Sequence, residues 1–128
     1  MTVPLVIVDG ANVVGSVPDG WWRDRPAAAA RLRDRLAAVL AEGLPDLPGP
    51  VEVALVVEGK ARDIPQTTNG VRIERAPASI SGDDKITDLV RLEAPTRRTV
   101  VVTADRGLRA RVVPLGAEVR GPSSVPRR

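Results

Sequence analysis

The sequence predicts an α/β fold in which a mainly parallel sheet carries helices on both faces. Three apolar runs, at residues 5–8, 53–57 and 99–103, are rich in β-branched residues and lack polar alternation. Strands buried on both faces have this pattern. Each run ends close to an acid, namely Asp9, Glu58 or Asp105. Because parallel strands end at the same edge of a sheet, we expect these carboxylates to gather at its carboxyl edge, where open α/β sheets keep their sites.

Length and composition limit the domain organisation and the chemistry. Residues 1–121 are expected to form one domain, and residues 122–128 a flexible basic tail. The sequence contains no Cys and no His, which excludes disulfides, thiol catalysis, a Ser-His-Asp triad and imidazole or thiolate metal sites. Carboxylates, hydroxyls, Asn, Lys and Arg remain as the groups available for catalysis.

The net charge of +3 comes from 19 basic and 16 acidic residues, and the basic ones are nearly all Arg. Arg suits bidentate contact with phosphate, although a composition biased towards Ala, Arg, Val and Pro explains the excess equally well. We find no basic-then-apolar leader and no apolar stretch near about 18 residues. A cytoplasmic protein without a membrane segment is therefore expected.

The first strand stops abruptly at Asp9. Gly10 and Ala11 permit a tight turn there, and Asn12 places an amide close behind the acid. Taken alone, Asp9 is equally well explained as the cap of a turn, since strand ends commonly carry Asp for that reason. The recurrence of the same pattern at the next two strands favours a site.

A helix is predicted over residues 27–42, where apolar residues recur at helical spacing. Asp24 is its expected N-cap, Pro26 lies in the first turn, and Gly43 ends the helix. Three prolines should keep residues 44–50 extended. Trp21 and Trp22 precede the helix and are the only aromatic residues of the sequence. They are therefore the only side chains that could stack on bases. The alternative is that one of them packs on the start of the helix as a hydrophobic staple.

The second half of the chain predicts a basic loop at 59–62, an edge strand at 71–74 and a helix beginning near residue 83. The helical phase puts Asp83 beside the buried stripe, and Asp84 and Asp88 on the far side. A short helix should follow Asp105, which is then either its N-cap or a site acid. A final strand is predicted at 116–120.

Four segments in order, at residues 8–14, 57–59, 82–86 and 101–106, resemble the motifs of NYN-domain proteins, bacterial relatives of the PIN-like ribonucleases. The resemblance spans nearly the whole chain. It implies a three-layer α/β/α sandwich with a central, mainly parallel sheet and a metal-dependent nuclease site at its carboxyl edge. Carried over position by position, the resemblance implies that Asp9, Asp83 and Asp105 are metal ligands and that Asp84 and Glu58 are further ligands. It also implies that Asp9, Asp83, Asp105 and Asn12 are the catalytic residues.

The residue types also favour a cation at this edge. Two carboxylates about 4 Å apart repel by roughly 4 kcal/mol at an effective dielectric near 20, so several of them converge only with a cation or with raised pKa values. An all-oxygen ligand set selects Mg²⁺ or Mn²⁺. Lys60, Arg62 and Arg106 lie near the same edge by sequence and are predicted to hold RNA phosphates.

The predicted function is therefore metal-dependent hydrolysis of RNA. Two alternatives stay open: a nucleotide pyrophosphohydrolase that uses the same acids, and a catalytically inactive RNA-binding module. A phosphoaspartate enzyme of the haloacid-dehalogenase type is disfavoured by Ala11, and no Gly-rich phosphate loop is present. The sequence leaves open the choice between RNA, DNA and free nucleotides, the number of metal ions, and whether two chains form a homodimer.

Overall fold

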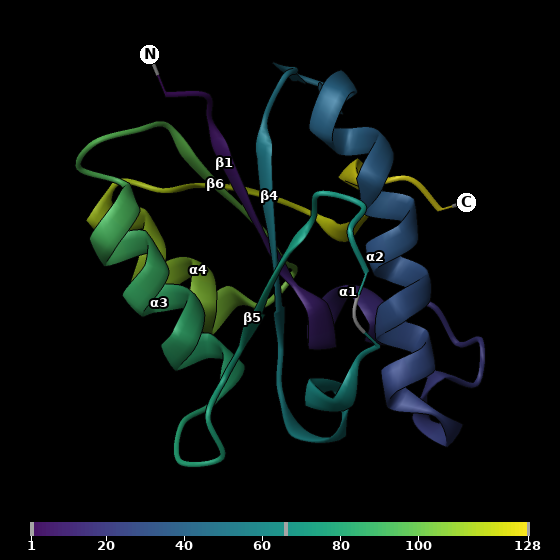
Figure 1. Ribbon diagram of the computed structural model, residues 1–128. Helices are drawn as coiled ribbons and strands as arrows, with labels where there is room; N and C mark the ends of the chain where they lie inside the picture. The colour runs from purple at the N-terminus through teal and green to yellow at the C-terminus, as the bar shows by residue number, and fades with distance from the viewer. Residues whose placement is uncertain (1, 66, 128) are drawn as a thin grey trace.

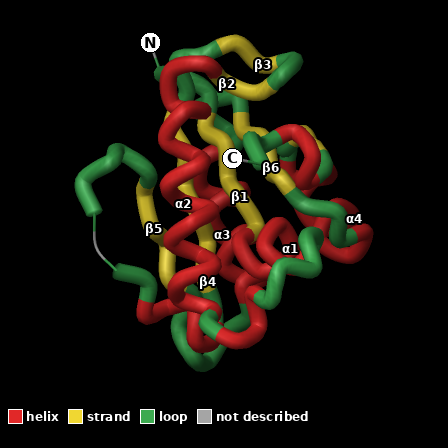
Figure 2. Tube along the Cα trace, turned by 90° about the vertical axis from the view of Figure 1, so that its right-hand side faces the viewer, coloured by secondary structure: helices red, strands yellow, loops and turns green. Residues whose placement is uncertain are grey.

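The computed structural model describes residues 2–65 and 67–127, and over these residues a five-stranded sheet runs through the middle of the molecule (Figures 1 and 2). Its strands are parallel to one another and lie in the order β5-β4-β1-β6-β7. The predicted parallel sheet is thus confirmed. Its members are β1 (Leu5–Asp9), β4 (Glu52–Val57), β5 (Arg72–Arg75), β6 (Thr99–Val102) and β7 (Glu118–Arg120).

Helices cover both faces of the sheet, as the three-layer sandwich requires. Figure 1 shows α1 (Gly10–Gly15) and α2 (Arg25–Glu42) on one side, and α3 (Gly82–Glu93) and α4 (Arg106–Val112) on the other. Four short 3-10 helices lie between or after these elements: η1 (Trp21–Arg23), η2 (Gly59–Asp63), η3 (Val113–Leu115) and η4 (Pro122–Ser124). Within the described ranges, the structure has no helix both long and apolar enough to cross a membrane.

Two apolar clusters hold the layers together. Val6 and Val8 of β1 face the cluster that contains Leu32 of α2, whereas Leu5 and Ile7 face the cluster beneath α3 and α4. Successive side chains of a strand point to opposite faces, so both sets are buried. This double burial is the reason that the strands show no polar alternation in the sequence.

The capping of α2 agrees with the prediction. The Asp24 carboxylate accepts a hydrogen bond from the Ala27 amide at 3.1 Å, and Gly43 ends the helix with a φ of 78°. The residues after α2 differ from the prediction of an extended segment. Here β2 (Gly43–Leu44) and β3 (Leu47–Pro48) pair as a small antiparallel hairpin.

Two further expectations need correction. Gly10 does not make a tight turn, because α1 begins directly at this residue. The segment from residue 122 to 126 is not a flexible tail: Val125 is buried among the residues of the α2-side core, and Arg35 Nε donates to the Pro126 carbonyl at 3.1 Å. Arg127 is exposed, and the last residue of the predicted tail lies outside the described residues.

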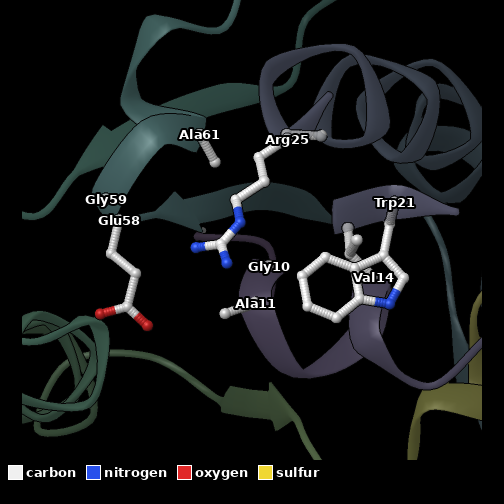
Figure 3. Close-up of a pocket in the computed structure, with 9 residues that line it drawn as sticks. Gly10, Ala11, Val14, Trp21, Arg25, Glu58, Gly59 and Ala61 are labelled. Atoms are coloured by element: carbon white, nitrogen blue, oxygen red, sulfur yellow. The ribbon is translucent and has the colours of Figure 1, made fainter. Parts of the chain in front are cut away.

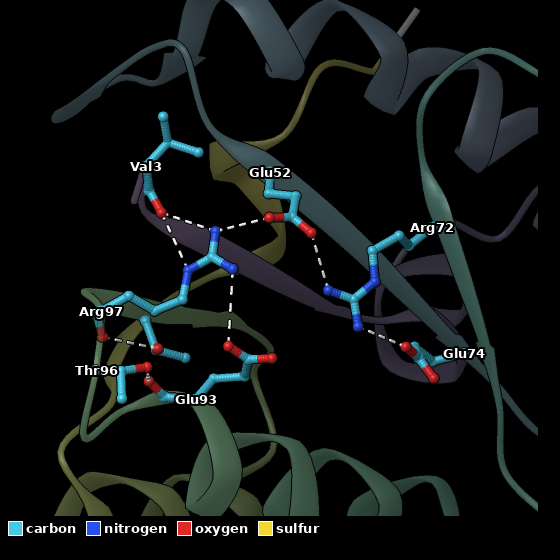
Figure 4. Close-up of polar contacts among 8 residues, drawn as sticks. Val3, Glu52, Arg72, Glu74, Glu93, Thr96 and Arg97 are labelled. Atoms are coloured by element: carbon cyan, nitrogen blue, oxygen red, sulfur yellow. Dashed lines mark hydrogen bonds and ion pairs between the residues drawn. The ribbon is translucent and has the colours of Figure 1, made fainter. Parts of the chain in front are cut away.

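The amino edge of the sheet is neutralised by ion pairs (Figure 4). Arg97, whose side chain is 9% exposed, donates to the Val3 carbonyl at 2.7 Å and to Glu52 at 2.8 Å. Arg72 reaches the other oxygen of Glu52 and also pairs with Glu74. Hydrogen bonds from Arg97 and then Arg72 hold the pKa of Glu52 below its usual range. Acids at this edge thus have Arg partners, unlike most of those at the opposite edge.

Candidate active site at the carboxyl edge of the sheet

An open cavity of about 360 Å³ lies at the carboxyl ends of the central strands. Four carboxylates from separate segments line it, together with small and polar neighbours. The residues that form its wall are Asp9, Ala11, Asn12, Glu58, Ser81, Asp83 and Asp105. The cavity adjoins the point where β1 pairs with β4 on one side and β6 on the other, which is the position where parallel α/β sheets bind ligands.

Asp9 is the most buried of these acids, with 5% of its surface exposed. The pairing of Val8 with Val102 places Thr103 beside it, and the Thr103 hydroxyl donates to Asp9 Oδ2 at 2.8 Å. Burial raises the pKa of Asp9 to about 6, although hydrogen bonds from Thr103 and the Asn12 amide lower it, and the charges of Asp83 and Glu58 add to the rise. The carboxyl group is therefore partly protonated close to neutral pH.

Asn12 and Asp105 connect the ends of β1 and β6. Asn12 Oδ1 accepts a hydrogen bond from the Ala104 amide at 2.8 Å, which fixes the loop that carries Asp105. The Asp105 carboxylate accepts from the Leu108 amide at 3.0 Å and so caps α4. Asp105 therefore caps α4 and also lines the cavity.

Glu58 is held against the start of α3. Its Oε2 accepts a hydrogen bond from the Gly82 amide at 2.6 Å. A Cβ atom on residue 82 would lie 3.0 Å from Glu58 Cδ, so the absence of a side chain at Gly82 permits this close contact. The interaction joins the loop after β4 to the helix that carries Asp83.

Asp83 and Asp84 are neighbours in sequence but have different surroundings. Asp83 lines the cavity, and its pKa is raised first by partial burial and then by the charges of Asp105 and Glu58. Over the residues that the structure describes, no hydrogen-bond partner holds its carboxylate. Asp84 instead accepts from Arg111 at 2.9 Å and completes a capping box with Ser81. The structure thus places the Asp84 carboxylate in an ion pair with Arg111 of α4 and outside the set of residues that line the cavity, whereas Asp83 lines it.

The donor set fits a hard divalent cation, since the polar side chains that line the cavity are four carboxylates, an amide and a hydroxyl, which all offer oxygen. As the side chains are placed, however, no three acidic residues in the described parts of the chain converge closely enough to coordinate one ion. The carboxylates of Asp9, Glu58 and Asp105 instead accept hydrogen bonds from neighbouring protein donors. Asp9, Glu58, Asp83 and Asp105 would therefore hold Mg²⁺ or Mn²⁺ only after rotation of side chains.

The predicted phosphate-binding residues lie on different sides of the cavity. Arg106 and Arg109 line a groove that shares Asp105 with the cavity. Lys60 and Arg62 lie on η2, and Arg62 donates to the Gly59 carbonyl at 3.1 Å. Neither of these two lines the acidic cavity as described. Sequence reasoning missed Arg109, although it follows Arg106 by three residues on the same helix and therefore on the same face.

The architecture is a three-layer α/β/α sandwich with a parallel sheet, and solved structures show the same fold. Rae1 (YacP) from Bacillus subtilis superposes with a TM-score of 0.73 and 19% sequence identity, over 97% of this chain and 71% of that chain. A tryptophan-to-leucine mutant of Rae1 gives a TM-score of 0.74 and 17% identity, over 94% and 70%. At such identities the likeness shows the fold alone. No protein-family model and no curated protein matches the sequence.

The Asp9→Asn variant is expected to be more stable than the parent in EDTA at pH 7. Because the pKa of Asp9 is higher in the folded protein than its ordinary value of 3.8, protonation of Asp9 stabilises the fold. This stabilisation is complete below pH 3.8 and is lost as the pH rises through about 6. Removing the charge should raise the free energy of unfolding by about 1–2 kcal/mol at pH 7, and by little at pH 4. Urea unfolding at both pH values measures this, with the exposed Asp88→Asn as control. Equal stabilities at pH 7 would show that Asp9 is not strained by burial.

Proposed function

We propose that this protein is a metal-dependent ribonuclease that hydrolyses phosphodiester bonds in the acidic cavity. The observation that supports this best is the meeting of Asp9, Glu58, Asp83 and Asp105 in one open cavity at the carboxyl edge. Acids placed for fold stability alone are normally paired with cations, as at the amino edge. Here Asp83 has a raised pKa and no hydrogen-bond partner among the described residues, which is the mark of a functional group.

The chain's own residues have distinct roles in this proposal. When bound, Mg²⁺ or Mn²⁺ would lower the pKa of a water molecule and neutralise charge on the phosphate. Asp83 offers an unengaged carboxylate for the ion. Thr103 sets the orientation of Asp9, and Asn12 fixes the loop that carries Asp105. Arg106, beside Asp105, would hold a phosphate of the substrate.

The surroundings of the cavity favour a polymer over a free nucleotide. The groove with Arg106 and Arg109 adjoins the cavity through Asp105, and a second hollow adjoins it on the other side through Ala11 and Glu58. Over the described residues, neither Arg106 nor Arg109 has a carboxylate within 4.0 Å. Their charges are thus available to successive phosphates, and the contiguous hollows provide a path for a strand.

One observation favours a second candidate, a catalytically inactive RNA-binding module. Three of the four cavity acids already serve as hydrogen-bond acceptors within the protein, and as placed they do not converge on one point. A protein that had lost catalysis would retain such acids as helix caps and loop anchors. Binding of RNA through the Arg side chains would then be the whole activity.

The test is incubation of the purified protein with end-labelled single-stranded RNA, single-stranded DNA or nucleoside triphosphates, in Mn²⁺, Mg²⁺ or EDTA. We expect internal cleavage of RNA with either metal and none in EDTA. Binding should weaken with salt by about 0.7 log units per tenfold salt for each phosphate contacted. Hydrolysis restricted to the triphosphates would assign a pyrophosphohydrolase, and RNA binding without cleavage would assign the inactive module.

A further inference from the structure

The second hollow beside the acids is an apolar pocket of about 290 Å³, close to the lower limit of roughly 300 Å³ for small-molecule sites (Figure 3). Small or aliphatic residues form most of its wall, and an aromatic ring, an Arg and a carboxylate complete it. The residues concerned are Gly10, Ala11, Val14, Trp21, Arg25, Ala29, Glu58, Gly59 and Ala61. Such a slot suits a flat ring with polar edges.

Trp21 provides an aromatic surface in this wall. It is half-buried, and Gly15 lies against it, since a Cβ on that glycine would be 3.8 Å from Trp21 Cζ2. Trp22 meets it edge-on, with ring centroids 5.9 Å apart, and is itself 52% exposed and outside the pocket. The Trp21 ring is therefore fixed by its neighbours, which lowers the entropy cost of using it to bind a ligand.

Arg25 and Glu58 supply polar groups at the pocket. The Arg25 guanidinium lies 5.5 Å from the centre of the Trp21 ring and extends over the pocket in the direction of Glu58 (Figure 3). Among the described residues, no carboxylate pairs with Arg25 within 4.0 Å. A flat heteroaromatic ring between these groups would stack on apolar surface and meet a donor on one side and an acceptor on the other.

The pocket adjoins the acidic cavity, because Ala11 and Glu58 line both. A group seated in the pocket therefore lies next to whatever occupies the cavity. In a nucleic acid, a base and its own phosphodiester are joined through a single sugar. A base in the pocket would bring that phosphodiester to the acids, and the continuing backbone to Arg106 and Arg109.

We propose that this pocket binds one unpaired nucleobase of a single-stranded RNA, with Trp21 as the stacking surface and Arg25 at its rim. The inference rests on the proposed function and adds the substrate class: the strand must be unpaired next to the cleaved bond. A base inside a duplex would first have to lose its stacking and its base pair, which costs free energy. The protein should therefore act on single strands and spare duplexes.

Tryptophan fluorescence provides the direct test, since Trp22→Phe leaves Trp21 as the only tryptophan of the sequence. In EDTA, where no cleavage occurs, an oligoribonucleotide of about ten nucleotides should quench this fluorescence on stacking. An abasic strand of equal length should not quench it and should bind about tenfold more weakly. The corresponding duplex should not quench it either. Equal affinity for the normal and abasic strands, or absence of quenching by a bound normal strand, would overturn the proposal.

Variants of the pocket provide a second measurement by fluorescence anisotropy. Trp21→Ala, and Ala61→Leu, which fills the pocket from η2, should each abolish the preference for the normal strand over the abasic one. The control Trp22→Phe should retain it, because Trp22 does not line the pocket and Phe keeps an aromatic ring beside Trp21. A retained preference in both pocket variants would contradict the proposal. A mononucleotide that quenches as strongly as the strand at equal concentration would contradict the assignment of a polymer.

The two proposals fail in different ways. Quenching and base preference without metal-dependent cleavage would leave the base pocket standing and remove the ribonuclease. Cleavage of RNA with no quenching and no base preference would leave the ribonuclease and remove the base pocket.

Discussion

Replacing Asp83 by Asn is expected to lower Mn²⁺-dependent cleavage of single-stranded RNA by at least about 100-fold. Asp83 lines the acidic cavity, and no protein donor within the described residues engages its carboxylate. The substitution removes one negative charge and half of the oxygen ligands of this side chain. Because its raised pKa reflects burial and neighbouring acids, the amide should not reduce the stability of the fold.

Asp84→Asn is the matched control for that experiment. It changes the same residue type one position later on α3, but the Asp84 carboxylate pairs with Arg111 and caps the helix outside the cavity. Cleavage by this variant should stay within about twofold of the parent, and its stability should stay close to that of the parent, because exposed ion pairs contribute little. Cleavage by Asp83→Asn at the rate of the parent would show that the cavity is not the reaction site, and equal loss in both variants would make Asp84 a further ligand.

The second large effect concerns Gly10, where β1 passes into α1. A Cβ at this position would lie 2.5 Å from the Val56 carbonyl oxygen on β4, a distance that real Cβ atoms do not tolerate. Because the obstacle is strand backbone, relief requires separation of α1 from the sheet. Gly10→Val should therefore lower the free energy of unfolding by at least about 3 kcal/mol, in a denaturant titration.

Gly121→Val is the matched control, since a Cβ there has no atom within 4 Å and the φ of −76° suits any residue. Its cost should stay below about 0.5 kcal/mol. A Gly10→Val protein as stable as the parent would mean that α1 does not pack against β4 as described. The acidic cavity, which depends on that packing, would then be in doubt too.

The sheet and the place of the acids were predictable because local patterns encode them. An unbroken run of apolar β-branched residues is required of a strand with helices on both faces, and parallel strands end together. The phase of α3 distinguished Asp83 from Asp84 because Ile86, Leu89 and Val90 must be buried. Each inference needed only residues that are close in sequence.

The features that were missed depend on contacts between distant residues. Residue 10 must be Gly because a backbone oxygen on β4 lies where a Cβ atom would be, and Val125 is buried in the core beside α2. Asp84 pairs with Arg111, which lies on another helix. The sequence alone was compatible with Trp21 as a stacking residue or as a hydrophobic staple. Its place in a pocket with Arg25 depends on how η1 and η2 approach one another. No local pattern specifies such contacts.

Titration of Mn²⁺ into the parent protein, followed by isothermal calorimetry, tests the central claim most directly. If the carboxyl-edge acids form a metal site, the parent and Asp84→Asn should bind Mn²⁺ saturably, and Asp83→Asn should lose at least about tenfold in affinity. The melting temperature of the parent should also rise with Mn²⁺, because the ion binds only the folded state. An absence of saturable binding to the parent, or equal binding by the parent and Asp83→Asn, would contradict the account.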